Sequence, residues 1–136
     1  MKLLSLILLA VLGFALWVRL APSDPARWHV SAGDVGNRDF AGAVIRMIPA
    51  GPGDMARLDR IIRATPRTTL LAGSPEEGMV TYITRSRLWG FPDYTTIEAR
   101  AGSIVIHGRL RFGSSDMGVN RARVEGWIAA LDSGRA

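Results

Sequence analysis

The chain opens with a run of apolar residues, from Leu3 to Val18, that no charged residue interrupts. As an α-helix this run is about 24 Å long, a little shorter than a hydrocarbon core of about 30 Å. Trp17 has the position of an aromatic residue at a membrane interface, and the long side chain of Arg19 can reach the headgroups. We therefore expect residues 1–21 to form an N-terminal transmembrane helix.

Two alternatives to an anchor stay open. A cleaved signal peptide needs a small-x-small pattern just before the cut site. Gly13 and Ala15 form such a pattern inside the apolar run, whereas a cut after Ala21 would place Arg19 in the pattern. The other alternative is a buried core helix.

The charges at the two ends of the apolar run set the expected orientation. The N-terminal amine and Lys2 lie before it, and Arg19 and Arg27 lie after it. We expect an N-in orientation, which makes the chain a single-pass inner-membrane protein with its domain facing the periplasm.

Residues 22–41 show no sustained periodicity, and two prolines and two glycines (Pro22, Pro25, Gly33 and Gly36) interrupt them. We expect this stretch to be a linker. The remaining residues, 42–133, carry periodic patterns and are expected to form one domain.

Alternating apolar and polar positions in that domain predict strands, and apolar residues at helical spacing predict two helices. The first helix has Asp54 as its expected N-cap, and the last is expected to be capped by Ser115 or Asp116. The predicted fold is α+β, with an antiparallel sheet of about five strands packed by two helices, in the order β-α-β-β-β-β-α. The predicted strands cover residues 42–48, 68–72, 79–86, 93–100 and 103–112.

The last predicted strand, residues 103–112, has the clearest alternation in the chain. Ile104, Ile106 and Gly108 share one face, while His107, Arg109 and Arg111 share the other with Val105. We expect the apolar face to meet the helices and the basic face to be available for binding.

The amino-acid composition excludes several kinds of functional site. The chain has no cysteine, which excludes disulfides, cysteine zinc sites, iron–sulfur clusters and thiol nucleophiles. The net charge is +5, the sequence pI is about 10.9, and Lys2 is the only lysine. The arginine excess has two interpretations, a bias toward arginine codons or a basic surface for phosphate, anionic lipid or nucleic acid.

The basic residues gather in the C-terminal half. Residues 85–123 contain seven arginines but only three carboxylates. One hypothesis is an anion site built by arginine forks beside the start of the last helix. The alternative is structural, with Asp116 as a helix cap and the arginines paired on a solvated face. An arginine in a first helical turn opposes the helix dipole, so we expect Arg121 to pair with Asp93 or Asp116. The candidate ligand-binding residues are Arg109, Arg111, Ser115, Asp116, Asn120, Arg121 and Asp93.

Signals for catalysis or cofactors are weak. Ser115, His107 and Asp116 can be combined into a triad on paper, but the sequence has no GxSxG elbow. Two histidines without ligand spacing do not indicate a metal site, and the sequence has no P-loop and no GxGxxG. We expect no cofactor, no metal and no nucleic-acid partner.

Two segments together resemble a known family. Residues 86–98 (SRLWGFPDYTTIE) and 109–127 (RLRFGSSDMGVNRARVEGW) resemble the hallmark of the family called domain of unknown function 1499, and the resemblance covers about residues 42–131. The cysteine-containing N-terminal motif of many members is missing, so the chain resembles a short, membrane-anchored bacterial branch. The resemblance implies no established activity. The matching residues are Phe91, Asp93, Arg111, Gly113, Ser115, Asp116, Gly118, Asn120 and Arg121.

These observations lead to two functional hypotheses. The first is a non-enzymatic envelope module that binds an anionic lipid, a small ligand or an envelope protein. The alternative is a hydrolase-like enzyme for an anionic substrate, with Asp93 or Asp116 as base and Arg111 or Arg121 as anion clamp. An apolar cavity between the sheet and the last helix would instead favour a carrier of hydrophobic ligands.

Overall fold

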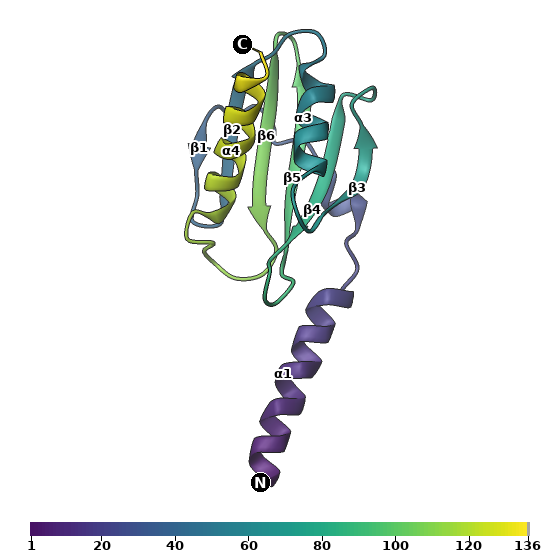
Figure 1. Ribbon diagram of the computed structural model, residues 1–136, viewed down its shortest axis with the longest axis vertical. Helices are drawn as coiled ribbons and strands as arrows, with labels where there is room; N and C mark the ends of the chain where they lie inside the picture. The colour runs from purple at the N-terminus through teal and green to yellow at the C-terminus, as the bar shows by residue number, and fades with distance from the viewer. Residues whose placement is uncertain (136) are drawn as a thin grey trace.

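A computed structural model of the chain describes residues 1–135 and contains one antiparallel sheet (Figure 1). The strand order is β1-β2-β6-β5-β4-β3. The strands are β1 (Arg38–Asp39), β2 (Ala43–Pro49), β3 (Thr68–Ser74), β4 (Met79–Arg85), β5 (Pro92–Arg100) and β6 (Ser103–Leu110). The helices are α1 (Lys2–Leu20), α2 (Pro25–Trp28), α3 (Asp54–Arg63) and α4 (Val119–Ser133). The predicted α+β class is confirmed.

The sheet has six strands where about five were expected. The additional strand is β1, a two-residue edge that pairs Arg38 with Ile45 and Asp39 with Val44 of β2. Two residues are too few to show an alternating pattern, so the sequence carries no signal for it.

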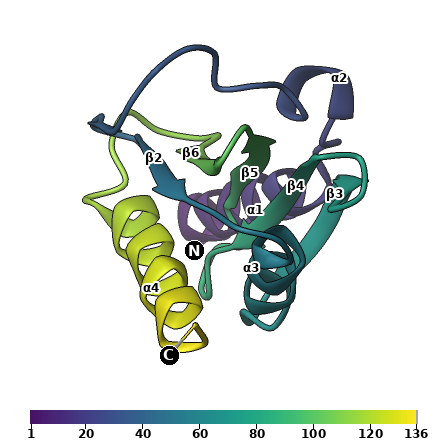
Figure 2. The ribbon, with the colours of Figure 1, turned by 90° about the horizontal axis from the view of Figure 1, so that it is seen from above.

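Helices α3 and α4 cover one face of the sheet and enclose the main core (Figures 1 and 2). Ile97 of β5 and Ile106 of β6 pack there with Val124, Trp127 and Leu131 of α4. Each of these side chains is at most 5% exposed. Burying one such side chain contributes about 1.5–3 kcal/mol. Buried side chains thus pack the space between the sheet and α4 in the described core, and this packing does not favour the alternative of a carrier with an apolar cavity there.

At Gly108 of β6 the helix α4 approaches the sheet closely. A Cβ atom at this position would lie 3.3 Å from Oδ1 of Asn120 and 3.3 Å from Cγ2 of Val124. The absence of a side chain therefore lets the first turns of α4 rest directly on β6.

The other face of the sheet is covered by residues 21–36, here called the back-face segment, which includes α2 (Figure 2). The Trp28 indole stacks on the Tyr94 ring with 3.9 Å between ring centroids and 10° between their planes. The His29 Nδ1 atom lies 2.9 Å from the Thr81 hydroxyl of β4. The stretch that sequence patterns describe as a linker is in contact with the sheet.

The starts of α3 and α4 differ from the predicted caps. Both N-cap positions are glycines with a left-handed backbone, Gly53 and Gly118, and Asp54 is the first residue of α3. The Asp54 carboxylate accepts a hydrogen bond from the Gly51 N–H at 2.8 Å and pairs with Arg135 at 2.7 Å. Its role is to tie the β2–α3 turn to the end of α4.

Helix α1 is long and apolar enough to cross a membrane, and its side chains are mostly exposed. Its 19 residues correspond to about 28 Å. Figure 1 shows α1 leaving the end of the domain opposite the C-terminus. The last turns of α1 touch the domain, with Phe14 against Phe91 at 6.3 Å and Trp17 against Phe112 at 5.4 Å between ring centroids.

Candidate functional site

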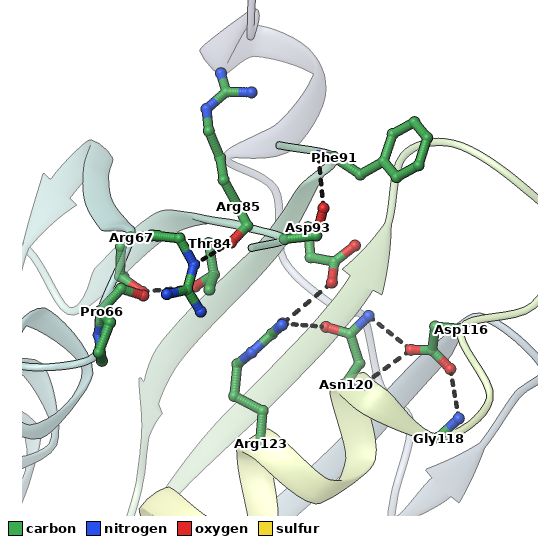
Figure 3. A network of polar contacts seen from close by, with 12 residues as sticks. Pro66, Arg67, Thr84, Arg85, Phe91, Asp93, Asp116, Gly118, Asn120 and Arg123 are labelled. Atoms are coloured by element: carbon green, nitrogen blue, oxygen red, sulfur yellow. Dashed lines mark hydrogen bonds and ion pairs between the residues drawn. The ribbon is translucent and has the colours of Figure 1, made fainter. Parts of the chain in front are cut away.

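Four residues form a continuous chain of hydrogen bonds, here called the polar joint, where β5 meets the start of α4 (Figure 3). They are Asp93, Asp116, Asn120 and Arg123. The Arg123 guanidinium donates to Asp93 Oδ2 at 3.2 Å and to Asn120 Oδ1 at 3.1 Å. The Asn120 side-chain amide donates to Asp116 Oδ2 at 2.7 Å. Asn120 is 1% exposed, so the joint is anchored in the protein interior.

Asp116 also holds the backbone at the start of α4. Its carboxylate accepts from the N–H groups of Gly118 and Asn120 at 2.9 and 3.0 Å. It therefore satisfies free helical N–H groups, as the sequence predicted for a capping residue, although it lies outside the N-cap position.

The two carboxylates of the joint have opposite pKa shifts. Burial raises the pKa of Asp93 above its ordinary value, and the charge and hydrogen bond of Arg123 work against this. Partial burial also disfavours the charged form of Asp116, but the backbone and side-chain donors of Asn120 hold its pKa below the ordinary value. The two carboxylates engage the donors of the joint, the Arg123 guanidinium and the Asn120 amide, which leaves these donors little capacity for an external anion.

Ser115 and Arg121 lie beside the joint but outside it. The Ser115 hydroxyl accepts from the Met117 N–H at 3.2 Å in the exposed β6–α4 loop. Arg121 pairs with Asp39 of β1 at 3.5 Å, and both side chains are about half exposed. The expectation that Arg121 pairs with Asp93 or Asp116 is wrong, because Arg123 occupies Asp93 and the amide of Asn120 occupies Asp116.

Arg109 and Arg111 lie on the opposite face of the sheet from the polar joint. Arg109 donates to the carbonyl oxygen of Trp28 and, at 3.2 Å, to the hydroxyl of Thr96. Arg111 donates to the Pro22 carbonyl at 2.8 Å and to the Tyr94 hydroxyl at 3.1 Å. These two candidate residues hold the back-face segment, and the sheet separates them from Asp93, Asp116 and Asn120.

Burial perturbs two basic groups on this face. Burial lowers the pKa of Arg109 to about 10, so the guanidinium stays charged at neutral pH. Burial, together with the neighbouring charge of Arg109, lowers the pKa of His107 to about 4. The imidazole is therefore neutral at neutral pH and can serve neither as a cation nor as an anion clamp.

Sequence reasoning missed a different cluster, here called the arginine groove, formed by Arg19, Arg67, Arg85 and Arg87. These residues line a cavity of about 300 Å³ together with Thr69, Ser86 and Gly90. Among residues 1–135, no carboxylate lies within salt-bridge distance of the four guanidinium groups. Arg85 and Arg87 belonged to the basic half of the sequence, but Arg19 and Arg67 come from distant segments.

Backbone carbonyls position three of these arginines. Arg67 Nε donates to the Arg85 carbonyl at 3.1 Å (Figure 3), and Arg85 donates to the Gly90 carbonyl at 2.9 Å. Arg19, at the end of α1, donates to the Leu88 carbonyl at 3.2 Å. Neutral acceptors orient the guanidinium groups and leave their positive charge uncompensated.

The loop of residues 86–91 between β4 and β5, here called the membrane-side loop, lies next to the arginine groove and α1. Leu88 is 75% exposed and Trp89 is 41% exposed. Phe91, in contrast, packs between Phe14 of α1 and Phe112, with 6.1 Å between the Phe91 and Phe112 ring centroids. Basic and apolar groups therefore lie together at the end of the domain from which α1 emerges.

The model of the family described as "Protein of unknown function (DUF1499)" matches residues 18–131. This chain belongs to the DUF1499 family. The matched region includes the back-face segment and the whole polar joint, so both belong to the part of the chain that the DUF1499 model describes. The predicted family resemblance is confirmed, over a longer region than the two segments that suggested it.

Other comparisons add no functional information on this DUF1499 chain. No curated protein matches it. Among solved structures, it is similar to a DUF4468 family protein from Bacteroides ovatus at 13% identity and a TM-score of 0.31. That match covers 65% of this chain and 63% of the other chain.

Proposed function

We propose that this DUF1499 chain is a single-pass bacterial envelope protein whose domain faces the periplasm and binds anionic lipid headgroups without catalysing a reaction. The arginine groove is the observation that carries the proposal. It combines four guanidinium groups that lack carboxylate partners in the described chain, and one of them, Arg19, is in the last turn of α1.

The chemistry of the arginine groove suits a phosphate group. Guanidinium groups bind phosphate oxygens through paired N–H donors, and their charge is never lost near neutral pH. A basic residue near an anionic membrane surface contributes about 1 kcal/mol. A small phosphorylated ligand has the same chemistry, but an anchor with Arg19 in its last turn keeps the groove at headgroup level and favours the lipid.

The other arginines that the sequence offered as anion-binding residues already have partners within the protein, which favours the arginine groove as the lipid site. Arg109 and Arg111 are engaged by carbonyls of the back-face segment, and Arg121 and Arg123 by carboxylates. The enzyme alternative required Asp93 or Asp116 as a free base. Both carboxylates accept hydrogen bonds within the polar joint, and this favours a non-enzymatic role.

Lipid selectivity tests the proposal directly. The full chain is reconstituted in phosphatidylcholine vesicles with spin-labelled phosphatidylglycerol or spin-labelled phosphatidylcholine as the probe lipid. We expect phosphatidylglycerol to be enriched in the motionally restricted lipid at the protein. The double variant Arg67→Gln/Arg87→Gln should reduce this preference by about fivefold per arginine, and added salt should weaken it.

The matched control is Arg57→Gln/Arg60→Gln, which removes the same charge. Arg57 and Arg60 line a separate groove beside the last turns of α4, at the end of the domain away from α1. This variant should keep the preference for phosphatidylglycerol. Equal restriction of both probe lipids by the unmodified chain, or equal effects of the two double variants, would contradict the proposal.

A further inference from the structure

A second groove lies directly beside the arginine groove and is almost entirely apolar. Ala10, Val11 and Phe14 of α1 line one side, and Trp89 and Phe91 of the membrane-side loop line the other. Its volume is about 430 Å³, within the range of roughly 300–1,000 Å³ that is typical of small-molecule sites. We call it the apolar groove.

The two grooves meet at the membrane-side loop. Gly90 lines the arginine groove, and its two neighbours in the chain, Trp89 and Phe91, line the apolar groove. A Cβ atom at Gly90 would lie 3.1 Å from the Arg19 side chain, so the backbone of the loop lies directly against the end of α1. One ligand can therefore contact both grooves at once.

The depth of the apolar groove matches the acyl region of one leaflet. At 1.5 Å per residue, Phe14 lies about 8 Å and Ala10 about 14 Å along α1 from Arg19. A leaflet has about 15 Å of hydrocarbon. With Arg19 at the headgroups, the apolar groove lies where the chains of neighbouring lipids run.

We infer that the chain binds one complete anionic glycerophospholipid of its own membrane, with the phosphate in the arginine groove and an acyl chain in the apolar groove. This inference rests on the proposed function and adds the acyl chain to it. The exposure of Leu88 and Trp89 agrees with it, because these side chains face hydrocarbon rather than water when the membrane-side loop lies in the leaflet.

Photo-cross-linking of the full chain tests the inference. The protein is placed in phosphatidylcholine nanodiscs that contain a small fraction of phosphatidylglycerol with a photoactivatable group in its acyl chain. We expect an excess of cross-links on Val11, Phe14 and Trp89 over Leu12 and Leu16, which lie on α1 at similar depth but do not line the apolar groove. The same photoactivatable chain on phosphatidylcholine should give no such excess.

Two variants of α1 distinguish binding in the apolar groove from lipid contact elsewhere on the helix surface. Ala10→Trp fills the apolar groove and should abolish the excess, whereas Leu12→Trp adds the same side chain outside the groove and should leave it intact. Replacing Arg67 and Arg87 by glutamine should lower the excess by about fivefold per arginine.

The outcomes separate this inference from the proposed function. If cross-links are distributed uniformly around α1 while the spin-label experiment still shows a preference for phosphatidylglycerol, the acyl-chain site is wrong. Headgroup binding is then still supported. An equal excess from both photoactivatable lipids also overturns the inference, because the occupant would then not be selected by its charge. Loss of any preference for phosphatidylglycerol overturns the proposed function itself.

Discussion

At the scale of single residues, the polar joint depends on one amide. Asn120 donates to Asp116 and accepts from Arg123, which in turn reaches Asp93 of β5. Helical spacing explains this choice of partners. Residues three apart lie on the same face of a helix, so Arg123 stands beside Asn120 while Arg121 is turned toward β1.

Removal of the Asn120 amide should destabilise the domain. Asn120→Ala leaves the Arg123 guanidinium and the Asp116 carboxylate each without one buried partner, and we expect a loss of about 2–3 kcal/mol in the free energy of unfolding. Denaturant unfolding of the full chain in detergent, followed by tryptophan fluorescence, measures this loss.

Ser115→Ala is the control for the joint, because Ser115 is exposed and holds only a local loop contact. Its effect should stay within about 0.5 kcal/mol. Equal unfolding free energies for the Asn120 and Ser115 variants would show that the joint contributes no stability.

At the scale of elements, the back-face segment is held by a row of guanidinium groups. Arg111 donates to the Pro22 carbonyl, Arg109 to the Trp28 carbonyl and Arg100 to the Gly33 carbonyl at 2.7 Å. Prolines and glycines leave such a segment without a regular hydrogen-bond ladder, so its carbonyls need other donors. Arg109 of β6 and Arg111, one residue after the end of β6, supply donors for two of these carbonyls.

Trp28 should carry much of the packing of this segment. We expect Trp28→Ala to lower the free energy of unfolding by about 2–3 kcal/mol, less than a fully buried aromatic residue, because Trp28 is only half-buried on Tyr94. Trp89→Ala removes the same side chain from the exposed membrane-side loop and should change stability by about 0.5 kcal/mol or less. Chemical unfolding in detergent micelles compares the two. If Trp28→Ala were as mild as Trp89→Ala, the segment would not be part of the cooperative unit.

At the scale of the whole molecule, the two ends of the sheet differ. One end carries α1, the arginine groove and the exposed membrane-side loop, and the other carries the C-terminal end of α4 (Figure 1). This difference between the two ends favours an orientation in which the membrane-side loop lies in the membrane interface and the end of α4 lies in water.

Labelling can measure that orientation, because the chain has no cysteine of its own. A nitroxide on Leu88→Cys should be more accessible to oxygen, which concentrates in lipid, than to a water-soluble nickel chelate. A nitroxide on Ala129→Cys, on the exposed side of α4, should show the reverse. Nickel accessibility as high at residue 88 as at residue 129 would place the membrane-side loop in water.

The sequence by itself determined the longer elements and the family, because period-two and helical patterns are local and need no knowledge of the partners they pack against. The short elements β1 and α2 show no such pattern. It also marked Asp116 as a group that holds the start of α4. Only the tertiary structure decided how the arginines are used. Arg109 lies on the face of β6 that points away from α4, and there the folded chain places the back-face segment over it. The pairing of β3 with β4 brings Arg67, just before β3, and Arg85 of β4 together next to Arg19 of α1. Such contacts join residues many positions apart, so no local pattern records them.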